Sequence, residues 1–175
     1  MSKFINFFIL SMYYFILIYL PSKSMCEICV KLRSKAAKLI FNQLGSNVNI
    51  AKGVRFGKGA KISIGNNSGL GENCYLVAMD FISIGDNVMI GPEVMILTGG
   101  HDYNDPTKSL IAQNIITKPV VIGNDCWISA RVTILPGISI CDRVIIAAGS
   151  IVSKSISESG IYGGNPARKI KDIPS

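Results

Sequence analysis

The segment Ile122–Val152 reads IGNDCWISARVTILPGISICDRVIIAAGSIV and repeats with a period of six residues. A helix has a period of 3.6 residues and a half-buried strand a period of two, so neither explains this spacing. A unit of one short strand and one tight turn does explain it, because three such units close a triangular coil and successive coils stack. The first position of every unit is a large β-branched residue: Ile122, Ile128, Ile134, Ile140, Ile146 and Val152.

The same period extends toward the N-terminus. It resumes at Ile50 and shifts by two residues at Ile62–Ile64 and again at Ile82–Ile84. We expect each shift to be a corner from which an extra pair of residues bulges while the stack continues. Gly, Asn and Asp recur between the strands, and they tolerate the left-handed backbone of tight corners. The prediction is an all-β chain, a parallel β-helix of hexapeptide repeats over residues 48–175. A sandwich of irregular strands is the alternative.

The charge of the chain is concentrated near the N-terminus. Eighteen Lys and Arg stand against 11 Asp and Glu, and residues 1–49 hold six of the basic residues and one acid. This distribution resembles no nucleic-acid-binding module, so no nucleic-acid partner is expected. Cys26 and Cys29 form a CxxC pair with no second pair and no nearby histidine, so we expect no metal site. The five cysteines are odd in number and scattered, and we expect free thiols and a cytoplasmic chain.

Residues 1–47 are predicted to form a helical arm. The stretch 4–20 carries no charge and as a helix would be about 26 Å long, just short of a hydrocarbon core. Three interpretations stay open: a helix on a membrane or within an oligomer, a transmembrane anchor, or a secretory signal. The missing cleavage site disfavours the signal. If the stretch spans a membrane, the basic residues that follow it place the β-helix in the cytoplasm.

A second helix is predicted after Pro21. Ser24 and Glu27 match a capping box, and Gly45 suits the C-terminal cap. Apolar residues recur at helical spacing from Met25 to Ile40, and lysines occupy the other face. Such a basic amphipathic helix indicates a membrane surface, here the inner face of the cytoplasmic membrane. The pair of helices can equally cover the open end of the prism, which would otherwise be an exposed sheet edge.

The six-residue rhythm breaks between Ile96 and Ile122. The intervening loop, residues 101–118, begins with His101, the only histidine of the chain. A long loop on a rigid repeat is more often functional than decorative. Histidine is the side chain that exchanges a proton near neutral pH, so His101 is the candidate general base, and Asp102 could orient its ring.

Six segments form a recognisable set. They are Gly91-Pro92, His101-Asp102, Asp105-Pro106, the run from Lys118 to Ile128, Leu135-Pro136-Gly137 and the run from Gly163 to Arg168. Together they resemble the hexapeptide acyltransferases, most closely the maltose/galactoside O-acetyltransferases and the O-acetyltransferases of capsule and exopolysaccharide synthesis. The resemblance covers about residues 47–172. It implies a left-handed β-helix, a homotrimer, and acetyl transfer from acetyl-CoA with His101 as base and without a metal.

The resemblance also implies a binding site for acetyl-CoA in a groove between adjacent prisms. Matched position by position, the backbone amides of Ala130 and Ala148 meet the thioester end and the pantetheine chain. Ser153 and Lys154 fall where the family contacts the far end, and Arg168 and Lys171 match the residues that meet phosphates. A solvated basic tail is the alternative for these cations. Trp127 matches an aromatic residue near the catalytic face, which packing would also explain.

The acceptor is the least determined part of the prediction. The family's sugar-binding Asn and Asp fall on Gly71 and Met79, with Asn73 and Asp80 nearby as candidate substrate-binding residues. This departure disfavours a maltose-like acceptor and favours a surface polysaccharide or its precursor. A serine or xenobiotic acetyltransferase and a non-catalytic scaffold are the alternatives. A γ-type carbonic anhydrase is excluded, because it needs three histidines.

Overall fold

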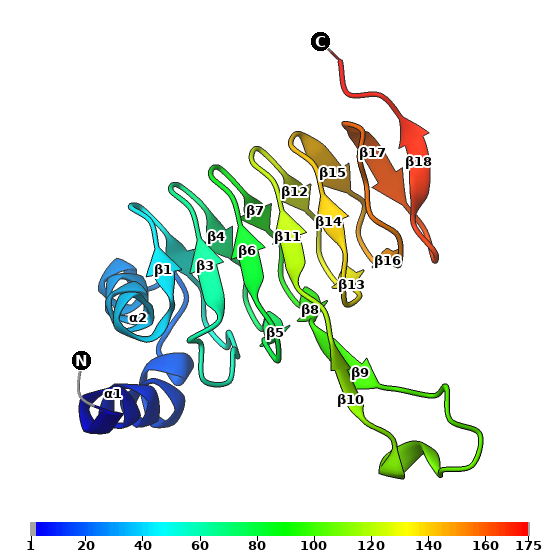
Figure 1. Cartoon of the computed structure of the whole chain (residues 1–175). Helices are drawn as coiled ribbons and strands as arrows, with labels where there is room; N and C mark the ends of the chain where they lie inside the picture. Colours follow the sequence, from blue (N-terminus) through cyan, green and yellow to red (C-terminus); the bar gives the residue numbers. More distant parts are fainter. Residues whose placement is uncertain (1–2, 175) are drawn as a thin grey trace.

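The computed structural model describes residues 3–174, and the strands stack as a triangular prism (Figure 1). Three parallel sheets, here called A, B and C, form its sides. Sheet A contains β1 (Gln43–Leu44), β3 (Ile62–Ile64), β6 (Ile82–Ile84), β11 (Val120–Ile122) and β14 (Ser139–Ile140). Sheet B contains β2 (Asn49–Ile50), β4 (Gly69–Leu70), β7 (Met89–Ile90), β12 (Trp127–Ile128), β15 (Val144–Ile146), β17 (Gly160–Gly163) and the antiparallel β18 (Arg168–Lys171). Sheet C contains β5 (Tyr75–Val77), β8 (Met95–Leu97), β13 (Thr133–Ile134) and β16 (Ile151–Val152).

The predicted ladder of aliphatic residues forms the core. The chain visits sheets A, B and C in turn, so a residue at the start of one unit pairs with its equivalent in the next coil. Ile122 pairs with Ile84 on one side and with Ile140 on the other, and all three are at most 5% exposed. Burial of one such side chain contributes about 1.5–3 kcal/mol, so the ladder supplies most of the stability. The β-helix prediction is confirmed.

The corners between sheets A and B repeat one backbone conformation. Asn67, Asn87 and Asp125 have φ angles of 53°, 56° and 52°, a left-handed conformation that Asn and Asp tolerate. Gly85 has a different reason to be glycine, because a Cβ there would lie 2.8 Å from the backbone of Gly123 in the next coil. Tight corners and close coils therefore both depend on the Gly-Asn/Asp-Asn/Asp segments.

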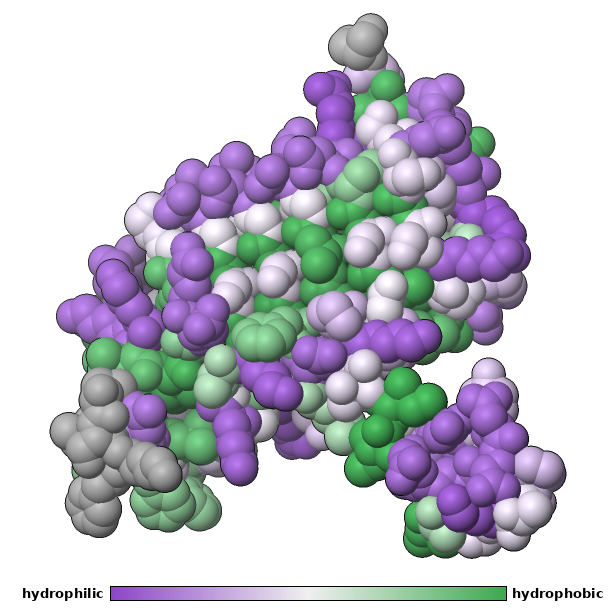
Figure 2. All heavy atoms as spheres, viewed as in Figure 1, coloured by the Kyte–Doolittle hydropathy of each residue, from purple (hydrophilic) through white to green (hydrophobic). Residues whose placement is uncertain are grey.

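A row of polar side chains joins the coils along this edge. The Asp86 N–H donates to Asn124 Oδ1 at 2.8 Å, and the Asn124 N–H donates to Asp142 Oδ1 at 2.6 Å. Asn66 accepts from the Ser46 N–H in the same way at 2.9 Å. Figure 2 shows these corners as a continuous hydrophilic ridge along the upper edge of the molecule. Each amide left free by a turn thus finds a partner in the next coil.

The two-residue shifts lie elsewhere than the sequence suggested. Ile62–Ile64 and Ile82–Ile84 are ordinary three-residue strands of sheet A with both isoleucines buried, so the expectation of bulged corners there is wrong. The additional residues lie just before these strands, in the corners between sheets C and A. Both isoleucines of each strand point inward, and for that reason the period alone could not locate the insertion.

The helical arm closes the N-terminal end of the prism. It contains α1 (Lys3–Phe15), η1 (Leu17–Tyr19) and α2 (Glu27–Ile40). The ring of Tyr13 is fully buried against Phe56, with ring centroids 4.6 Å apart, and its hydroxyl donates to the Val54 carbonyl at 2.9 Å. Phe41 stacks edge-on against the same Phe56 ring at 4.7 Å. The expectation that the arm covers the open end is confirmed. None of the helices within residues 3–174 has the length and apolarity needed to cross a membrane.

Three details of the arm differ from expectation. Helix α2 is capped by Cys26 without a side-chain hydrogen bond, so Ser24 is not its N-cap. Its buried face is rotated, since Arg33 is fully buried while Met25 is 81% and Ile28 69% exposed. Helix α2 ends before β1, so Gly45 does not cap it; a Cβ at Gly45 would instead meet the backbone of the next coil at 2.6 Å.

The cysteines follow the expectation only in part. Cys26 and Cys29 form a disulfide at the start of α2, so the expectation of free thiols is wrong for this pair. Cys74 and Cys126 are free and buried in the core, and Cys141 is free and half-buried. Burial raises the pKa of the Cys74 thiol to about 11, so it remains protonated and behaves as a small apolar side chain.

Arg33 joins the arm to the first coil. Its Nε donates to the Ile50 carbonyl at 2.8 Å, Nη1 to the Leu20 carbonyl at 3.0 Å, and Nη2 to the Pro21 carbonyl at 3.2 Å. The guanidinium of α2 thus binds two other segments, residues 20–21 and Ile50 of the first coil. The planar fork of arginine suits this arrangement, which lysine cannot reproduce.

We predict that Arg33→Met lowers the free energy of unfolding by about 2–4 kcal/mol, because it leaves three inward carbonyls without donors. Urea denaturation followed by circular dichroism measures the change. Lys35→Met on the exposed face of α2 is the matched control and should change stability by less than about 0.5 kcal/mol. Equal stability of the two variants would contradict the role of Arg33.

Candidate functional site

The loop predicted to be functional, residues 101–118 and here called the functional loop, leaves the prism at a corner between sheets C and A. Its ends, β9 (Gly99–His101) and β10 (Ile115–Thr117), pair as an antiparallel hairpin in which His101 lies opposite Ile115. Figures 1 and 2 show the hairpin projecting from the body as a separate lobe. His101 is exposed at the end of β9, so its ring is accessible to groups outside its own coil. Within residues 3–174, no group of three or more His, Cys, Asp or Glu side chains gathers as a metal site.

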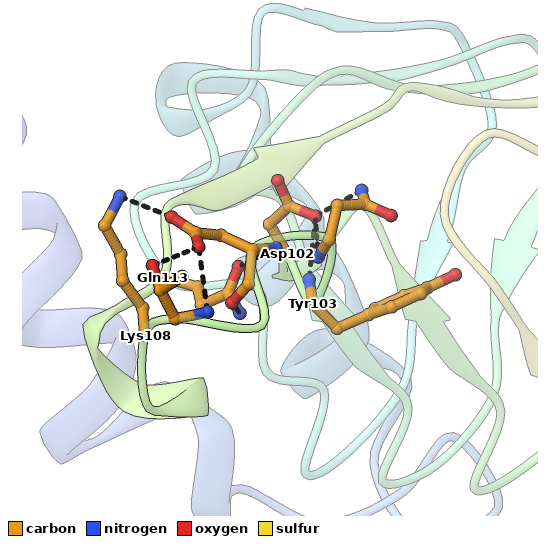
Figure 3. Close-up of polar contacts among 7 residues, drawn as sticks. Asp102, Tyr103, Lys108 and Gln113 are labelled. Carbon is orange, nitrogen blue, oxygen red and sulfur yellow. Dashed lines mark hydrogen bonds and ion pairs between the residues drawn. The ribbon is translucent and has the colours of Figure 1, made fainter.

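Asp102 holds the loop backbone. Its Oδ1 accepts hydrogen bonds from the N–H of Tyr103 at 2.7 Å and of Asn104 at 3.1 Å (Figure 3). No hydrogen bond connects Asp102 to the His101 ring in the part of the chain that the structure describes. The expectation that Asp102 orients the ring is therefore not met; it shapes the turn that follows the histidine.

Gln113 closes the far side of the loop and was missed by the sequence analysis. Its side chain is only 9% exposed, and its Nε2 donates to the Asp105 carbonyl at 2.8 Å (Figure 3). The Asp105 carboxylate accepts from Thr107 and pairs with Lys108 at 3.0 Å, and these contacts, Thr107 first, lower its pKa. A single glutamine in a polar loop has no spacing that would identify it beforehand.

Ala130 and Ala148 line one groove at the corners between sheets B and C. Pro92, Glu93, Arg131 and Gly149 complete this groove, which encloses about 410 Å³. Among the described residues, neither the Ala130 N–H nor the Ala148 N–H donates to a protein group. Arg131 and Glu93 form an ion pair of 2.7 Å along its wall. The groove thus presents two free backbone donors one coil apart, beside side chains small enough to admit a chain-like ligand.

The other predicted cofactor residues lie toward the C-terminal end of the prism. Ser153 and Lys154 are exposed in the corner that follows β16, on the same edge as the functional loop. Arg168 and Lys171 begin and end β18 and are exposed, without an ion pair to any described residue. Lys169 between them is held by Asp172 at 2.7 Å and Glu158 at 3.2 Å, which raise its pKa to about 12. Arg168 and Lys171 therefore remain available to an external anion.

The two candidate acceptor residues do not share a site within one chain. Asn73 is exposed in a corner between sheets B and C, where its φ is 57°. Asp80 lies at the next corner, beside the base of the functional loop, where its N–H donates to Thr98 Oγ1 at 2.8 Å. Gly99 packs on Met79 at this point, so the loop leaves the prism directly next to Asp80.

A shallow hollow on the outer face of sheet B, here called the tryptophan hollow, lies away from both corners. Gly69, Met89 and Trp127 follow one another on adjacent strands, and Trp127 is 47% exposed. These three residues line a cavity of about 370 Å³ that extends to Asn47 and Asn49. Trp127 is the only tryptophan of the chain.

Two family models match the repeats. Bacterial transferase hexapeptide (six repeats) matches residues 119–154, and hexapeptide repeat of succinyl-transferase matches residues 61–96. An acetyltransferase of Lysinibacillus sphaericus named for macrolides is 59% identical over 51 residues, which are 29% of this chain and 28% of that protein. An Escherichia coli acetyltransferase named for colanic acid biosynthesis is 34% identical over 77 residues, 44% of this chain and 40% of that protein. The chain thus aligns with less than half the length of these curated relatives.

Solved structures match over nearly the whole chain. A maltose O-acetyltransferase from Clostridium difficile 630 has a TM-score of 0.82 and 30% identity, covering 99% of this chain and 90% of that one. A galactoside acetyltransferase in complex with coenzyme A has a TM-score of 0.81 and 31% identity, covering 98% of this chain and 80% of that one. The similarity therefore includes the helical arm as well as the prism.

Proposed function

This chain belongs to the hexapeptide-repeat transferases, and from that membership we propose that it transfers an acetyl group from acetyl-CoA to a hydroxyl of a saccharide. One observation carries the proposal. The groove with the free Ala130 and Ala148 amides occurs in a chain that matches, over 98% of its length, an acetyltransferase bound to coenzyme A.

His101 is the proposed general base. The acceptor oxygen attacks the acetyl carbonyl carbon while its proton passes to the imidazole of His101; the carbon–sulfur bond breaks, and the thiolate of coenzyme A leaves and is then protonated. The His101 ring has no hydrogen bond to a described residue, and the pairing of β9 with β10 holds its backbone. The transfer is direct, because no serine or cysteine stands in the motif as a nucleophile.

The cofactor residues have complementary chemistry. The two free amides can donate to the carbonyl groups of pantetheine, and Ala130, Ala148 and Gly149 leave the groove open. Ser153 and Lys154 would meet the chain farther along. Arg168 and Lys171 carry uncompensated charges suited to its phosphates.

The proposed acceptor is a sugar of a surface polysaccharide or its precursor. The match to the colanic acid relative supports it, and Asn73 and Asp80 remain the candidate residues for holding it. A hydroxyl of an apolar small molecule is the second candidate, favoured by the 59% identity to the macrolide relative over 51 residues. The two differ in acceptor but share the base and the cofactor.

The proposed assembly is a homotrimer in which the loop of one subunit reaches the next. The hairpin projects from its own prism and exposes Ile111 by 86%, Leu110 by 67% and Ile115 by 55%. Apolar side chains on such a projection would be covered by a neighbouring copy. This arrangement brings His101 of one chain to the groove of another.

The arm is proposed to rest on the inner face of the cytoplasmic membrane. Phe7, Phe8, Phe15 and Tyr19 are between 66% and 81% exposed on α1 and η1, and aromatic rings favour the membrane interface. Deleting residues 1–22 would not test this interpretation cleanly, because it would also remove Tyr13 from the core.

We predict that His101→Ala lowers acetyl transfer by about 10²–10⁴-fold, the contribution typical of a general base. Coenzyme A affinity, measured by calorimetry, should stay within about threefold because His101 lies outside the groove of its own chain. An acceptor panel of oligosaccharides and macrolides in the same assay distinguishes the two acceptor classes. Loss of transfer and of coenzyme A binding together would indicate misfolding.

A mixing experiment tests the trimer. We predict that His101→Ala and Ala148→Trp subunits are each inactive alone but recover about a quarter of wild-type activity when co-expressed, since random assembly restores that share of intersubunit sites. A mixture without activity would place base and groove in the same chain.

For the membrane surface, we predict that Phe7→Ser with Phe8→Ser weakens sedimentation with anionic vesicles at least about tenfold, because two exposed rings lose their apolar contact. Ile170→Ser, which removes a 62% exposed apolar side chain from β18, is the control and should have no effect. Unchanged sedimentation of the double variant would show that these rings of the arm do not make the membrane contact.

A further inference from the structure

A second cavity, here called the lysine groove, runs between α2 and the first corner of the prism. It encloses about 360 Å³ between Lys23, Lys31, Lys35 and Lys38 on one side and residues 45–49 on the other. Glu27 is the only acid in its lining, and it is engaged by Lys31 at 3.0 Å, which lowers the pKa of Glu27. Lys23, Lys35 and Lys38 have no ion-pair partner among the described residues. The groove therefore carries a net positive charge that the protein does not neutralise.

The lysine groove is continuous with the tryptophan hollow. Lys23, Asn47 and Asn49 line both cavities, so the walls of one lead directly into the other. The shared segment is polar: Asn47 donates to Asn67 at 3.1 Å, and the Oδ1 of Asn49 has no hydrogen-bond partner. A ligand that follows both cavities would meet cations first, then amides, and finally an indole face.

From this sequence of groups we infer that the lysine groove and the tryptophan hollow together bind an anionic saccharide chain, one that carries carboxylate or phosphate groups. Ammonium groups pair with the anionic substituents, side-chain amides bond to hydroxyl groups, and the apolar face of a sugar ring packs on Trp127. The inference rests on the proposed saccharide acceptor and deepens it, because it specifies a charged polymer rather than a neutral sugar.

A membrane surface is a poorer occupant of these cavities. The lysines line a concave groove that faces the corner at residues 45–49, whereas a bilayer contacts convex surfaces. Lipid headgroups would also leave the amides and Trp127 unused, since these lie beyond the lysines on the face of sheet B. The exposed rings of α1 are a separate surface.

The sole tryptophan makes a direct binding test possible. The full-length chain is titrated with a hexamer of galacturonic acid, and Trp127 fluorescence is recorded; maltohexaose is the neutral probe. We expect a saturable change with the acidic hexamer, at least about tenfold weaker binding of maltohexaose, and loss of the difference at high salt, because screening weakens exposed charge pairs. Equal binding of the two hexamers, or no change at Trp127, would overturn the inference.

Two pairs of lysine substitutions test which charges bind the acidic hexamer. Lys23→Gln with Lys38→Gln should weaken binding of the acidic hexamer about tenfold, the effect of losing two charge-assisted contacts. Lys58→Gln with Lys61→Gln removes the same charge at exposed positions outside the groove and should change affinity less than about twofold. An equal loss of affinity in both variants would show that binding depends only on the net charge of the protein, which would overturn the inference. A Lys23/Lys38 variant that binds the hexamer normally but no longer sediments with anionic vesicles would assign the lysines to the membrane.

The binding readout is independent of acetyl transfer. His101→Ala should bind the acidic hexamer like the wild type, since His101 lines neither cavity. If transfer fails with every acceptor while hexamer binding persists, the proposed function fails and the binding site stands. If transfer to neutral sugars succeeds while the hexamers are not distinguished, only the inference fails.

Discussion

The stacking of identical positions in successive coils is the constraint on which this molecule depends. The aliphatic ladder holds every coil in register with the next, so a side chain at one corner is always followed by an equivalent position in the next coil. Residues far apart in the chain, such as Ala130 and Ala148, therefore line a single groove. The prism itself has no interior room for a ligand, because its core is filled by isoleucine, leucine and valine. Binding and chemistry are confined to corners, outer faces and the one long loop.

The sequence was most informative where the repeat was strict. The period of six predicted the inward residues, and the Gly-Asn-Asp segments predicted the corners, because both result from local geometry. The prediction for the buried face of α2 failed because of tertiary packing. Arg33 occupies the core face of a helix whose pattern suggested that Met25 and Ile28 lie there, and three carbonyl partners from other segments explain its burial. No helical period encodes such partners.

The same distinction applies to the candidate site. His101 could be identified because it is the only histidine and begins the one long loop of the repeat. The positions of Ala130 and Ala148 follow from the repeat together with the family resemblance. The roles of Asp102 and Gln113 could not be predicted, since a loop backbone is held by contacts that depend on its final course. Asn73 and Asp80, close in sequence, lie at different corners because a single strand separates them.

The corners between sheets C and A have one more property of interest. Six positions separate Ile134 from Ile140 across this edge, but eight separate Phe56 from Ile64 and Leu76 from Ile84, and the functional loop departs from the same edge. Every departure in length has thus accumulated on one side of the prism, while the ladder remains intact. Insertions along this edge can therefore lengthen or replace loops at little risk to folding. A designer who wishes to graft a recognition loop should begin there.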